Sequence, residues 1–488
     1  MFSPTDTIVA IATAPVRAGI GVVRLSGPRA RAVARAILTA AHDLEPRHAT
    51  LTRVLGGLER EAPPSSPGRP RVPRAVEGAA SEGRIPKPES RNPRIDEVIA
   101  TYFPAPRSYT AEDVVEISAH GSVVLLRDIV RAAIGAGARL AEPGEFTLRA
   151  FLNGRIDLVQ AEAVADLVEA VTPLQARVAF DQLEGTLTRA IAALDQELFD
   201  LAARLEASVD FPDEGYHFVA PGEAAAALGR VRDGIDRLLA TSASGRVIRE
   251  GRHIAILGKP NVGKSSLFNR LVGTDRAIVA PGPGTTRDML RESIDLDGIR
   301  LGLVDTAGIR ATEDEVEQEG VARARGAAGV ADLVVLLLDR SRALEDVDRA
   351  LLRETAAAPR VVVVNKVDLP GEWAEEELDA WPGVIRLSLE TGEGLRELRG
   401  AMRAALEVEE PLRDAAIVTN VRHETLLRQA RKAIARAAGN IARAGESASE
   451  ELVLADIADG RRAFEEVTGK RTTDDLLRRI FERFCVGK

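Results

Sequence analysis

Residues 258–265 read Gly-Lys-Pro-Asn-Val-Gly-Lys-Ser, a pattern whose groups could bind the phosphates of a nucleotide. In this pattern glycines let backbone N–H groups close around the β-phosphate, Lys264 reaches the β- and γ-phosphates, and the Ser265 hydroxyl binds Mg²⁺. A β-type run at 253–257 precedes the loop and a helical pattern at 266–272 follows it, so a helix N-terminus adds its positive dipole. The segment is predicted to be a P-loop.

Two further motifs follow in the order that a GTPase needs. Asp305-Thr-Ala-Gly308 closes a predicted strand at 299–304, where the carboxylate can act on Mg²⁺ through water and a glycine amide can face the γ-phosphate. Asn365-Lys-Val-Asp368 follows four consecutive valines, a pattern typical of a buried strand. The Asp368 carboxylate can accept hydrogen bonds from N1–H and the 2-amino group of guanine, a donor pair that adenine lacks. Together the motifs predict an α/β GTPase domain.

The residue after Gly308 is Ile309, where Ras-type GTPases carry a glutamine that positions the attacking water. Hydrolysis must therefore draw on other groups. The Asn261 side chain and the carbonyls of residues 280–288 could hold a monovalent cation against the phosphates. The acidic run 313–317 lies where a second switch is expected, although it could equally be the solvated start of a helix.

Composition limits the other classes of protein. The 488 residues suggest about three domains. A single cysteine, Cys485, excludes a disulfide framework and a cysteine-based zinc site. No apolar run is long enough to span a membrane and no leader pattern is present, so a soluble, cytoplasmic protein is expected. With a net charge of −9, contact with nucleic acid would need a local basic patch.

The pattern along the chain predicts a GTPase domain inserted in an all-α helical domain and preceded by an α+β domain. Residues 1–153 alternate β-type runs (8–12, 21–25, 97–103 and 114–118) with helical ones. Residues 59–94 are rich in Pro, Arg, Gly and Ser and are predicted to be a disordered insertion; a basic nucleic-acid arm is the alternative. Apolar residues at helical spacing from Leu183 to Leu205 predict one long helix. The predicted boundaries are 154–248 and 411–488 for the helical domain and 249–410 for the GTPase domain, with Thr473 as the N-cap of the last helix.

Several short segments together carry a resemblance to a known family. They are Asp-Thr-Ile-Val-Ala at 6–10, Gly-Ile-Gly-Val-Val-Arg-Leu-Ser-Gly at 19–27, Ser-Tyr-Thr-Ala-Glu-Asp-Val-Val-Glu at 108–116, Pro-Gly-Glu-Phe at 143–146, Arg-Ala-Phe-Leu-Asn at 149–153 and Phe-Cys-Val-Gly-Lys at 484–488. In this order around a GTPase domain, they make the chain resemble the bacterial tRNA-modification GTPases of the MnmE (TrmE) family over nearly its whole length, excepting 59–94.

The resemblance implies a function that the P-loop alone does not. Members of the family act with a flavoprotein partner, MnmG (GidA), in a heterotetramer to install a (carboxymethyl)aminomethyl group at C5 of the wobble uridine of certain tRNAs. The N-terminal domain is implied to form the homodimer and to bind a 5-formyl-tetrahydrofolate-type one-carbon donor. Arg24, Glu116, Arg155 and Lys488 match the family's folate-contacting residues, and Arg155 stands where relatives often have Lys.

The resemblance also implies roles around the nucleotide. Potassium is placed between Asn261, the carbonyls of Ala280 and Gly282, and Thr285; Thr286 joins Ser265 on Mg²⁺. Glu317 matches the water-orienting residue and shares the catalytic role with Lys264. The full predicted GTP site is Gly258, Asn261, Val262, Gly263, Lys264, Ser265, Ser266, Ala280, Pro281, Gly282, Pro283, Gly284, Thr285, Thr286, Asp305, Thr306, Ala307, Gly308, Asn365, Lys366, Asp368, Ser388, Leu389 and Glu390. Ser388-Leu-Glu390 departs from the usual Ser-Ala-Lys, which predicts weaker stacking on guanine with specificity retained.

Two other functions share the GTPase motifs. A ribosome-assembly GTPase would act as an RNA-binding switch, but neither a KH-type Gly-x-x-Gly module nor a second P-loop follows the GTPase segment. A one-carbon-transfer enzyme with a regulatory GTPase domain would turn over folate without tRNA. Cys485 could be a nucleophile, but an inert thiol is the simpler interpretation, and a structural role is expected for His120.

Overall fold

The computed structural model describes residues 5–40, 42–56, 94–210, 219–274, 293–304, 326, 329–373, 383–406, 415–443 and 450–487. These residues divide into two compact units, one built from 1–156 with 473–488 and the other from 157–472. The predicted insertion at 59–94, apart from Arg94, lies outside the described residues.

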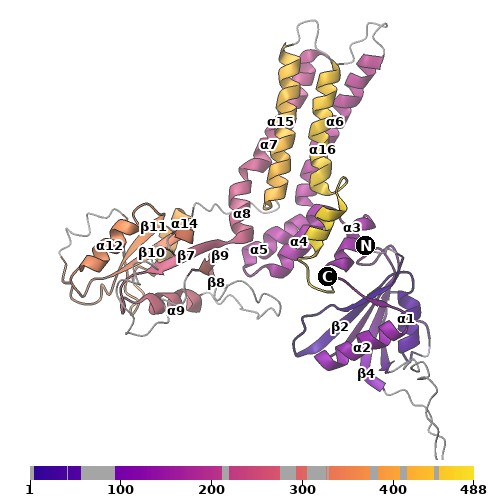
Figure 1. The fold of residues 1–488 in the computed structure, drawn as a ribbon, viewed down its shortest axis with the longest axis horizontal. Coiled ribbons are helices and arrows are strands. Elements are labelled where there is room, and N and C mark those ends of the chain that lie inside the picture. The colour runs from indigo at the N-terminus through magenta and orange to yellow at the C-terminus, as the bar shows by residue number, and fades with distance from the viewer. Residues whose placement is uncertain are drawn as a thin grey trace, which may run out of the picture. The chain divides into compact units, whose positions relative to one another are not determined.

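The first unit contains a six-stranded sheet in the order β3-β4-β5-β2-β1-β6. Among the described strands of this sheet, the β1–β6 pair is parallel and the other pairs are antiparallel. Two helices, α1 (Ala30–Ile37) and α2 (Val123–Gly135), contribute with the sheet to one apolar core (Figure 1). The strands are β1 (Ile8–Ile11), β2 (Ala18–Ser26), β3 (Ala49–Leu55), β4 (Arg94–Phe103), β5 (Val114–Gly121) and β6 (Arg139–Leu140). The sequence missed β3 and β6, because β3 mixes apolar with polar residues and β6 has only two residues.

The end of the chain packs into this first unit. Helix α17 (Asp474–Phe481), which begins at the predicted N-cap Thr473, contacts α3 (Glu145–Leu152). The ring centroids of Phe481 and Phe484 lie 5.2 Å apart. The domain boundaries predicted from the sequence placed all of 411–488 in the helical domain, whereas residues 473–488 group with the N-terminal unit. The cause is the burial of Leu477 and Phe481 on the apolar face of α17, the helix that contacts α3.

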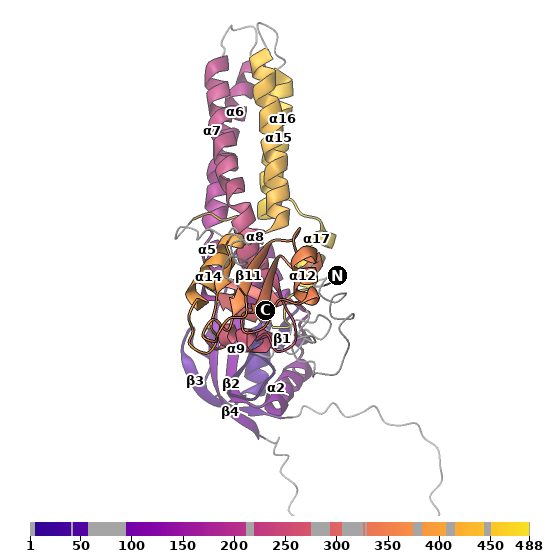
Figure 2. The ribbon, with the colours of Figure 1, turned by 90° about the vertical axis from the view of Figure 1, so that its left-hand side faces the viewer.

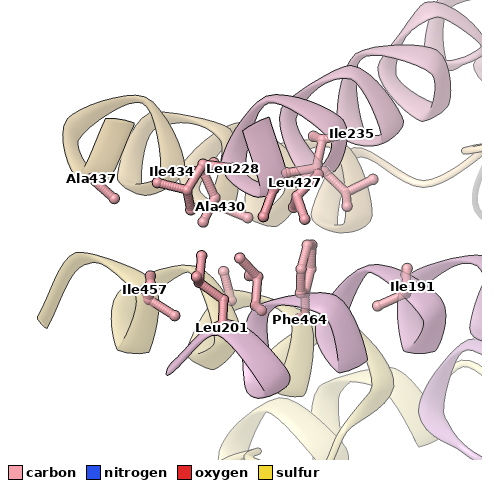
Figure 3. Packing of buried hydrophobic residues seen from close by; sticks show 14 of the residues in the cluster. Ile191, Leu201, Leu228, Ile235, Leu427, Ala430, Ile434, Ala437, Ile457 and Phe464 are labelled. Atoms are coloured by element: carbon pink, nitrogen blue, oxygen red, sulfur yellow. The ribbon is translucent and has the colours of Figure 1, made fainter. Parts of the chain in front are cut away.

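One part of the second unit is a bundle of helices (Figures 1 and 2). Apolar residues of α6, α7, α15 and α16 point toward one another between the helices, as Ile191, Leu228, Ile434 and Phe464 do in Figure 3. On α15 the buried positions 427, 430, 434 and 437 follow the spacing of packed helices. The bounds are α4 (Leu158–Glu169), α5 (Pro173–Leu183), α6 (Thr186–Asp210), α7 (Pro221–Ala240), α8 (Ser242–Glu250), α15 (Val421–Arg443) and α16 (Glu450–Thr468).

The predicted long helix from Leu183 to Leu205 is wrong at its start. Leu183 ends α5, and α6 begins at Thr186. Gly185 between them has φ +81°, a left-handed conformation that interrupts a right-handed helix. The apolar spacing continues across this break, which is why the pattern alone did not show it.

The other part of the second unit is a six-stranded sheet in the order β12-β11-β10-β7-β9-β8. Its strands are parallel except for β8. Every residue of β10 is buried, as expected for a parallel strand covered on both faces. The predicted α/β domain between helical segments is thus confirmed. The elements are β7 (Arg252–Leu257), α9 (Lys264–Thr274), β8 (Ser293–Leu296), β9 (Ile299–Leu303), β10 (Leu333–Asp339), α12 (Asp346–Glu354), β11 (Arg360–Asn365), β12 (Ile385–Arg386) and α14 (Leu395–Ala405).

Helix α4 is bonded to the chain on both sides of this inserted domain. Before it, an Arg249 guanidinium nitrogen lies 2.8 Å from an Asp166 carboxylate oxygen. After it, Arg422 and His423 lie 3.0 and 2.7 Å from the buried Glu162 carboxylate. Burial alone would raise the pKa of Glu162, but His423 and Arg422 outweigh it and hold that pKa at about 2.

Candidate functional sites

The P-loop follows β7 and runs into α9, as the sequence predicted. Gly263 has φ +108°, and a Cβ atom there would lie 2.5 Å from the side-chain nitrogen of Asn365. Only glycine fits this position, both for its backbone conformation and for its close approach to the next motif. Asn261 also has positive φ, at +61°, within the same tight turn.

The ammonium group of Lys264 lies against the backbone of this loop. Its Nζ donates hydrogen bonds to the carbonyl oxygens of Gly258 and Lys259, each 2.8 Å away. Burial lowers the pKa of Lys264. An ammonium group on the first residue of a helix, beside the N–H groups of the loop, is chemically suited to bind the oxyanions of phosphate. Ser265 and Ser266 follow on the exposed first turn of α9.

The neighbouring Lys259 ties the loop to α12. Its Nζ lies 2.6 Å from Asp348 Oδ2 and 3.2 Å from Glu345 Oε2. Burial alone would lower the pKa of Lys259, but the two carboxylates outweigh it and raise that pKa. Glu345 is also the N-cap of α12 and forms a reciprocal capping box with Asp348. The ion pair therefore connects the loop to a capped helix end.

The Asn365–Asp368 motif meets the P-loop at the carboxyl edge of the sheet, where β7 and β11 flank β10. The Asn365 side chain is buried and donates to the carbonyl oxygen of Val262, 2.8 Å away. Lys366 Nζ lies 2.5 Å from Asp339 Oδ2. Burial alone would raise the pKa of Asp339, but Lys366 and the hydrogen bonds from Ser341 hold it below its ordinary value. Asp368 is exposed at this edge.

The Ser388–Glu390 segment completes the described part of this edge. The Ser388 side chain is buried, and its Oγ accepts a hydrogen bond from the Thr391 backbone nitrogen at 3.1 Å. A Cβ at Gly263 would lie 3.1 Å from Leu389 Cδ1, so this segment also borders the P-loop. Glu390 is exposed. The P-loop, the Asn365–Asp368 motif and the Ser388–Glu390 segment thus meet at this edge of the sheet.

The remaining predicted nucleotide residues lie outside the described residues. They are Ala280, Pro281, Gly282, Pro283, Gly284, Thr285, Thr286, Asp305, Thr306, Ala307, Gly308 and Glu317. Their predicted roles in binding Mg²⁺, K⁺ and water therefore stay predictions. Across the part of the chain that the structure describes, no group of three or more His, Cys, Asp or Glu side chains could hold a metal ion.

A second candidate site is a cavity of about 510 Å³ in the first unit. Arg24, Glu116 and Arg155, three of the four predicted cofactor-binding residues, line it. Arg24 on β2 and Glu116 on β5 are directly opposite in the ladder, and Arg24 Nη2 lies 2.8 Å from Glu116 Oε1. The guanidinium also lies over the Tyr109 ring, 4.8 Å from its centroid. This stacking and the carboxylate fix the orientation of Arg24.

The chain's last described residues approach the same arginine. Arg24 Nη1 lies 3.5 Å from the Gly487 carbonyl oxygen. Gly487 has φ +100°, and a Cβ atom there would lie 2.2 Å from the Ile11 carbonyl oxygen. Val486 forms an isolated bridge with Pro143. Lys488, the fourth predicted cofactor residue, follows this docked tail but lies outside the described residues.

Sequence reasoning missed several residues that line the cavity. They are Arg47, Phe103, Pro106, Arg107, Ser108, Tyr109 and Val114. Ser108, Tyr109 and Val114 belong to the family-like segment 108–116 and could have been found there, whereas Arg47 lies in no motif. Cys485 is exposed. His120 Nδ1 lies 2.8 Å from Asp96 Oδ1, a pairing that agrees with a structural role.

In the described part of the chain, no helix combines the length and the apolar composition needed to cross a bilayer.

Comparison with known proteins gives matches over almost the whole chain. A family model described as the MnmE helical domain matches residues 158–485, and one described as the N-terminus of the GTP-binding protein TrmE matches residues 7–155. A protein of Koribacter versatilis named tRNA modification GTPase MnmE is 43% identical over 484 residues, which cover 99% of each chain. Proteins of the same name from Nitrosomonas europaea and Syntrophotalea carbinolica are 41% and 42% identical over 487 residues, again 99% of each chain.

Proposed function

The chain belongs to the MnmE family of tRNA modification GTPases, and from this premise we propose that its GTP hydrolysis serves the modification of the wobble uridine at C5. The proposed reaction installs a (carboxymethyl)aminomethyl group together with the flavoprotein MnmG, in a heterotetramer built on a homodimer of this chain. The one-carbon unit comes from a 5-formyl-tetrahydrofolate-type donor, and the protein acts in the cytoplasm. The observation that supports this proposal best is the cavity where Arg24, Glu116 and Arg155 meet, since a GTPase switch alone has no use for it.

In the GTPase site, we assign the chain's residues to binding, orientation and charge. Lys264 and the loop amides hold the β- and γ-phosphates, Ser265 and Thr286 hold Mg²⁺, and Asp368 reads guanine. Asn261, with the carbonyls of Ala280 and Gly282 and with Thr285, holds K⁺, which supplies positive charge near the phosphates. Glu317 orients the water that attacks the γ-phosphorus, the role for which Ile309 has no suitable group.

In the cofactor site, the Glu116 carboxylate accepts hydrogen bonds from the amino group and ring N–H of the pterin. Arg24 holds that carboxylate in place from the neighbouring strand, 2.8 Å away. Arg155 and Lys488 provide cations for the glutamate carboxylates of the folate. The docking of the tail through Gly487 supports a place for Lys488 beside this site.

The test is nucleoside analysis of tRNA from a deletion strain that carries either the native gene or Glu116→Gln. We expect the deletion to lack the C5-modified wobble nucleoside, the native gene to restore it, and Glu116→Gln to fail while its GTP hydrolysis stays normal. Glu97→Gln, an exposed carboxylate on β4 paired with Arg53, is the matched control and should restore modification. A deletion strain with unchanged wobble nucleosides would contradict the proposal, and altered ribosome assembly instead would favour the switch.

A further inference from the structure

The cavity of the first unit carries far more positive than negative charge. Its lining includes the four arginines Arg24, Arg47, Arg107 and Arg155, against the single carboxylate of Glu116. That carboxylate is already engaged by Arg24. Within the described part of the chain, no carboxylate pairs with the other three guanidinium groups. A ligand that fits this cavity must therefore bring several negative charges of its own.

The charges are arranged along the sheet. Phe103 on β4 is paired with Val114, and Val114 lies two residues from Glu116 on the same face of β5. Two residues of strand span about 7 Å. The cavity thus has a carboxylate end at Glu116, an apolar middle at Val114 and Phe103, and a further end beyond Phe103.

Arg47 and Arg107 occupy that further end. The Arg47 backbone nitrogen donates to the Tyr102 carbonyl oxygen at 2.7 Å, which fixes Arg47 beside β4. Its guanidinium lies 5.9 Å from the Phe103 ring centroid and donates to the Arg107 carbonyl oxygen. Arg47 is thereby oriented by the ring and by the loop that carries Arg107. Both side chains are exposed and can reach an extended ligand.

We propose that Arg47 and Arg107 form a subsite for the additional carboxylates of a poly-γ-glutamylated folate, so that the protein prefers the polyglutamate form of its one-carbon donor. This inference rests on the proposed function, which assigns folate to the cavity. Each added γ-linked glutamate contributes one carboxylate further along the chain from the pterin. Guanidinium groups bind carboxylates through paired N–H donors, and two arginines match two added glutamates.

The experiment is titration calorimetry on the full-length protein with 5-formyl-tetrahydrofolate as monoglutamate and as triglutamate. We expect the native protein to bind the triglutamate roughly three- to tenfold more tightly, the range for two solvent-accessible ion pairs. The preference should shrink as NaCl rises, because exposed charge pairs are screened. In Arg47→Gln/Arg107→Gln it should disappear, with monoglutamate affinity unchanged.

Arg131→Gln is the matched control, since Arg131 is an exposed arginine of α2 paired with Asp128, and it should keep the preference. If the double variant binds neither the monoglutamate nor the triglutamate, the single variant Arg107→Gln is the test. It must reduce the preference for the triglutamate and leave the monoglutamate affinity unchanged. Equal affinities of the native protein for the two forms would overturn the subsite and leave the folate site standing. Failure of the native protein to bind either form would overturn the folate site and this subsite with it.

Discussion

The side-chain nitrogen of Asn365 donates a hydrogen bond to the carbonyl oxygen of Val262, 2.8 Å away, and so joins the Asn365–Asp368 motif directly to the P-loop. The bond is buried, and it links residues that are 103 positions apart in the chain. On the other side, Lys259 is held by Asp348 of α12. The loop that cradles phosphate is therefore shaped by contacts with β11 and α12 as well as by its own glycines.

Asn365→Ala should weaken the binding of GTP and GDP together. The substitution leaves the buried Val262 carbonyl without its donor, which costs about 1–3 kcal/mol, or roughly a fivefold to 150-fold rise in Kd. Fluorescent-nucleotide titration measures this change. Glu397→Gln, on the exposed face of α14, is the control and should bind like the native protein. Unchanged affinity in Asn365→Ala would show that the loop keeps its shape without this bond.

Asp368→Asn should shift base preference from guanine to xanthine. Asparagine presents an N–H donor that suits the 2-carbonyl of xanthine, whereas the native carboxylate needs the 2-amino donor of guanine. Competition between GTP and XTP measures the preference. If the variant still selects GTP, the exposed Asp368 is not the group that reads the base.

GTP hydrolysis should be much faster in KCl than in NaCl at equal ionic strength. Asn261 lies in the tight turn of the P-loop, and Ile309 offers no water-positioning group, so a cation of potassium size is expected to supply the missing charge. Steady-state phosphate release in the two salts tests this expectation. Asn261→Ala should lose the difference between the salts, and equal rates for the native protein would reject the cation site.

Acid should destabilise the second unit through Glu162. Its folded-state pKa of about 2 lies below the ordinary value of 4.5, so its stabilisation is complete above pH 4.5 and is lost as the pH falls toward 2. The full loss is on the order of 3 kcal/mol. Urea unfolding followed by circular dichroism at several pH values should show this slope, and Glu162→Gln should flatten it.

The control for that slope is Glu424→Gln, which removes a carboxylate from the exposed pair with Arg428 on α15. Its stability should depend on pH as the native protein's does. If the unfolding free energy of Glu162→Gln depends on pH as that of the native protein does, other carboxylates dominate acid unfolding.

Gly487→Ala should weaken folate binding and leave GTP hydrolysis intact. The new Cβ would lie 2.2 Å from the Ile11 carbonyl oxygen, and φ at this position is +100°, so the tail must leave its place beside Arg24. Val486→Ala, at a half-exposed neighbour, is the control and should bind folate normally. Calorimetry and phosphate release on each variant separate the two activities. Normal folate affinity in Gly487→Ala would show that the tail is not part of the site.

The residues at the carboxyl edge of the second sheet were predictable because each belongs to a short motif at the end of a strand. Gly263, Asn365 and Ser388 are examples from three such motifs. The cavity was only partly predictable. Arg24 and Glu116 lie in recognisable segments, but Arg47 reaches the cavity through a backbone bond to Tyr102, and no local pattern encodes such a contact. The break at Gly185 was missed for a related reason, since the apolar spacing continues on either side of it.

Helix α4 is attached to the chain on both sides of the inserted domain, so the two ends of that domain share one support. The Arg249–Asp166 pair holds the chain to α4 just before the inserted domain. The Arg422–Glu162 pair holds it to the same helix just after that domain. Because both ion pairs involve α4, a displacement of one end of the domain relative to the other must move α4 or break one of the pairs. Breaking either ion pair would remove one of the charge contacts that join α4 to the chain beside the inserted domain.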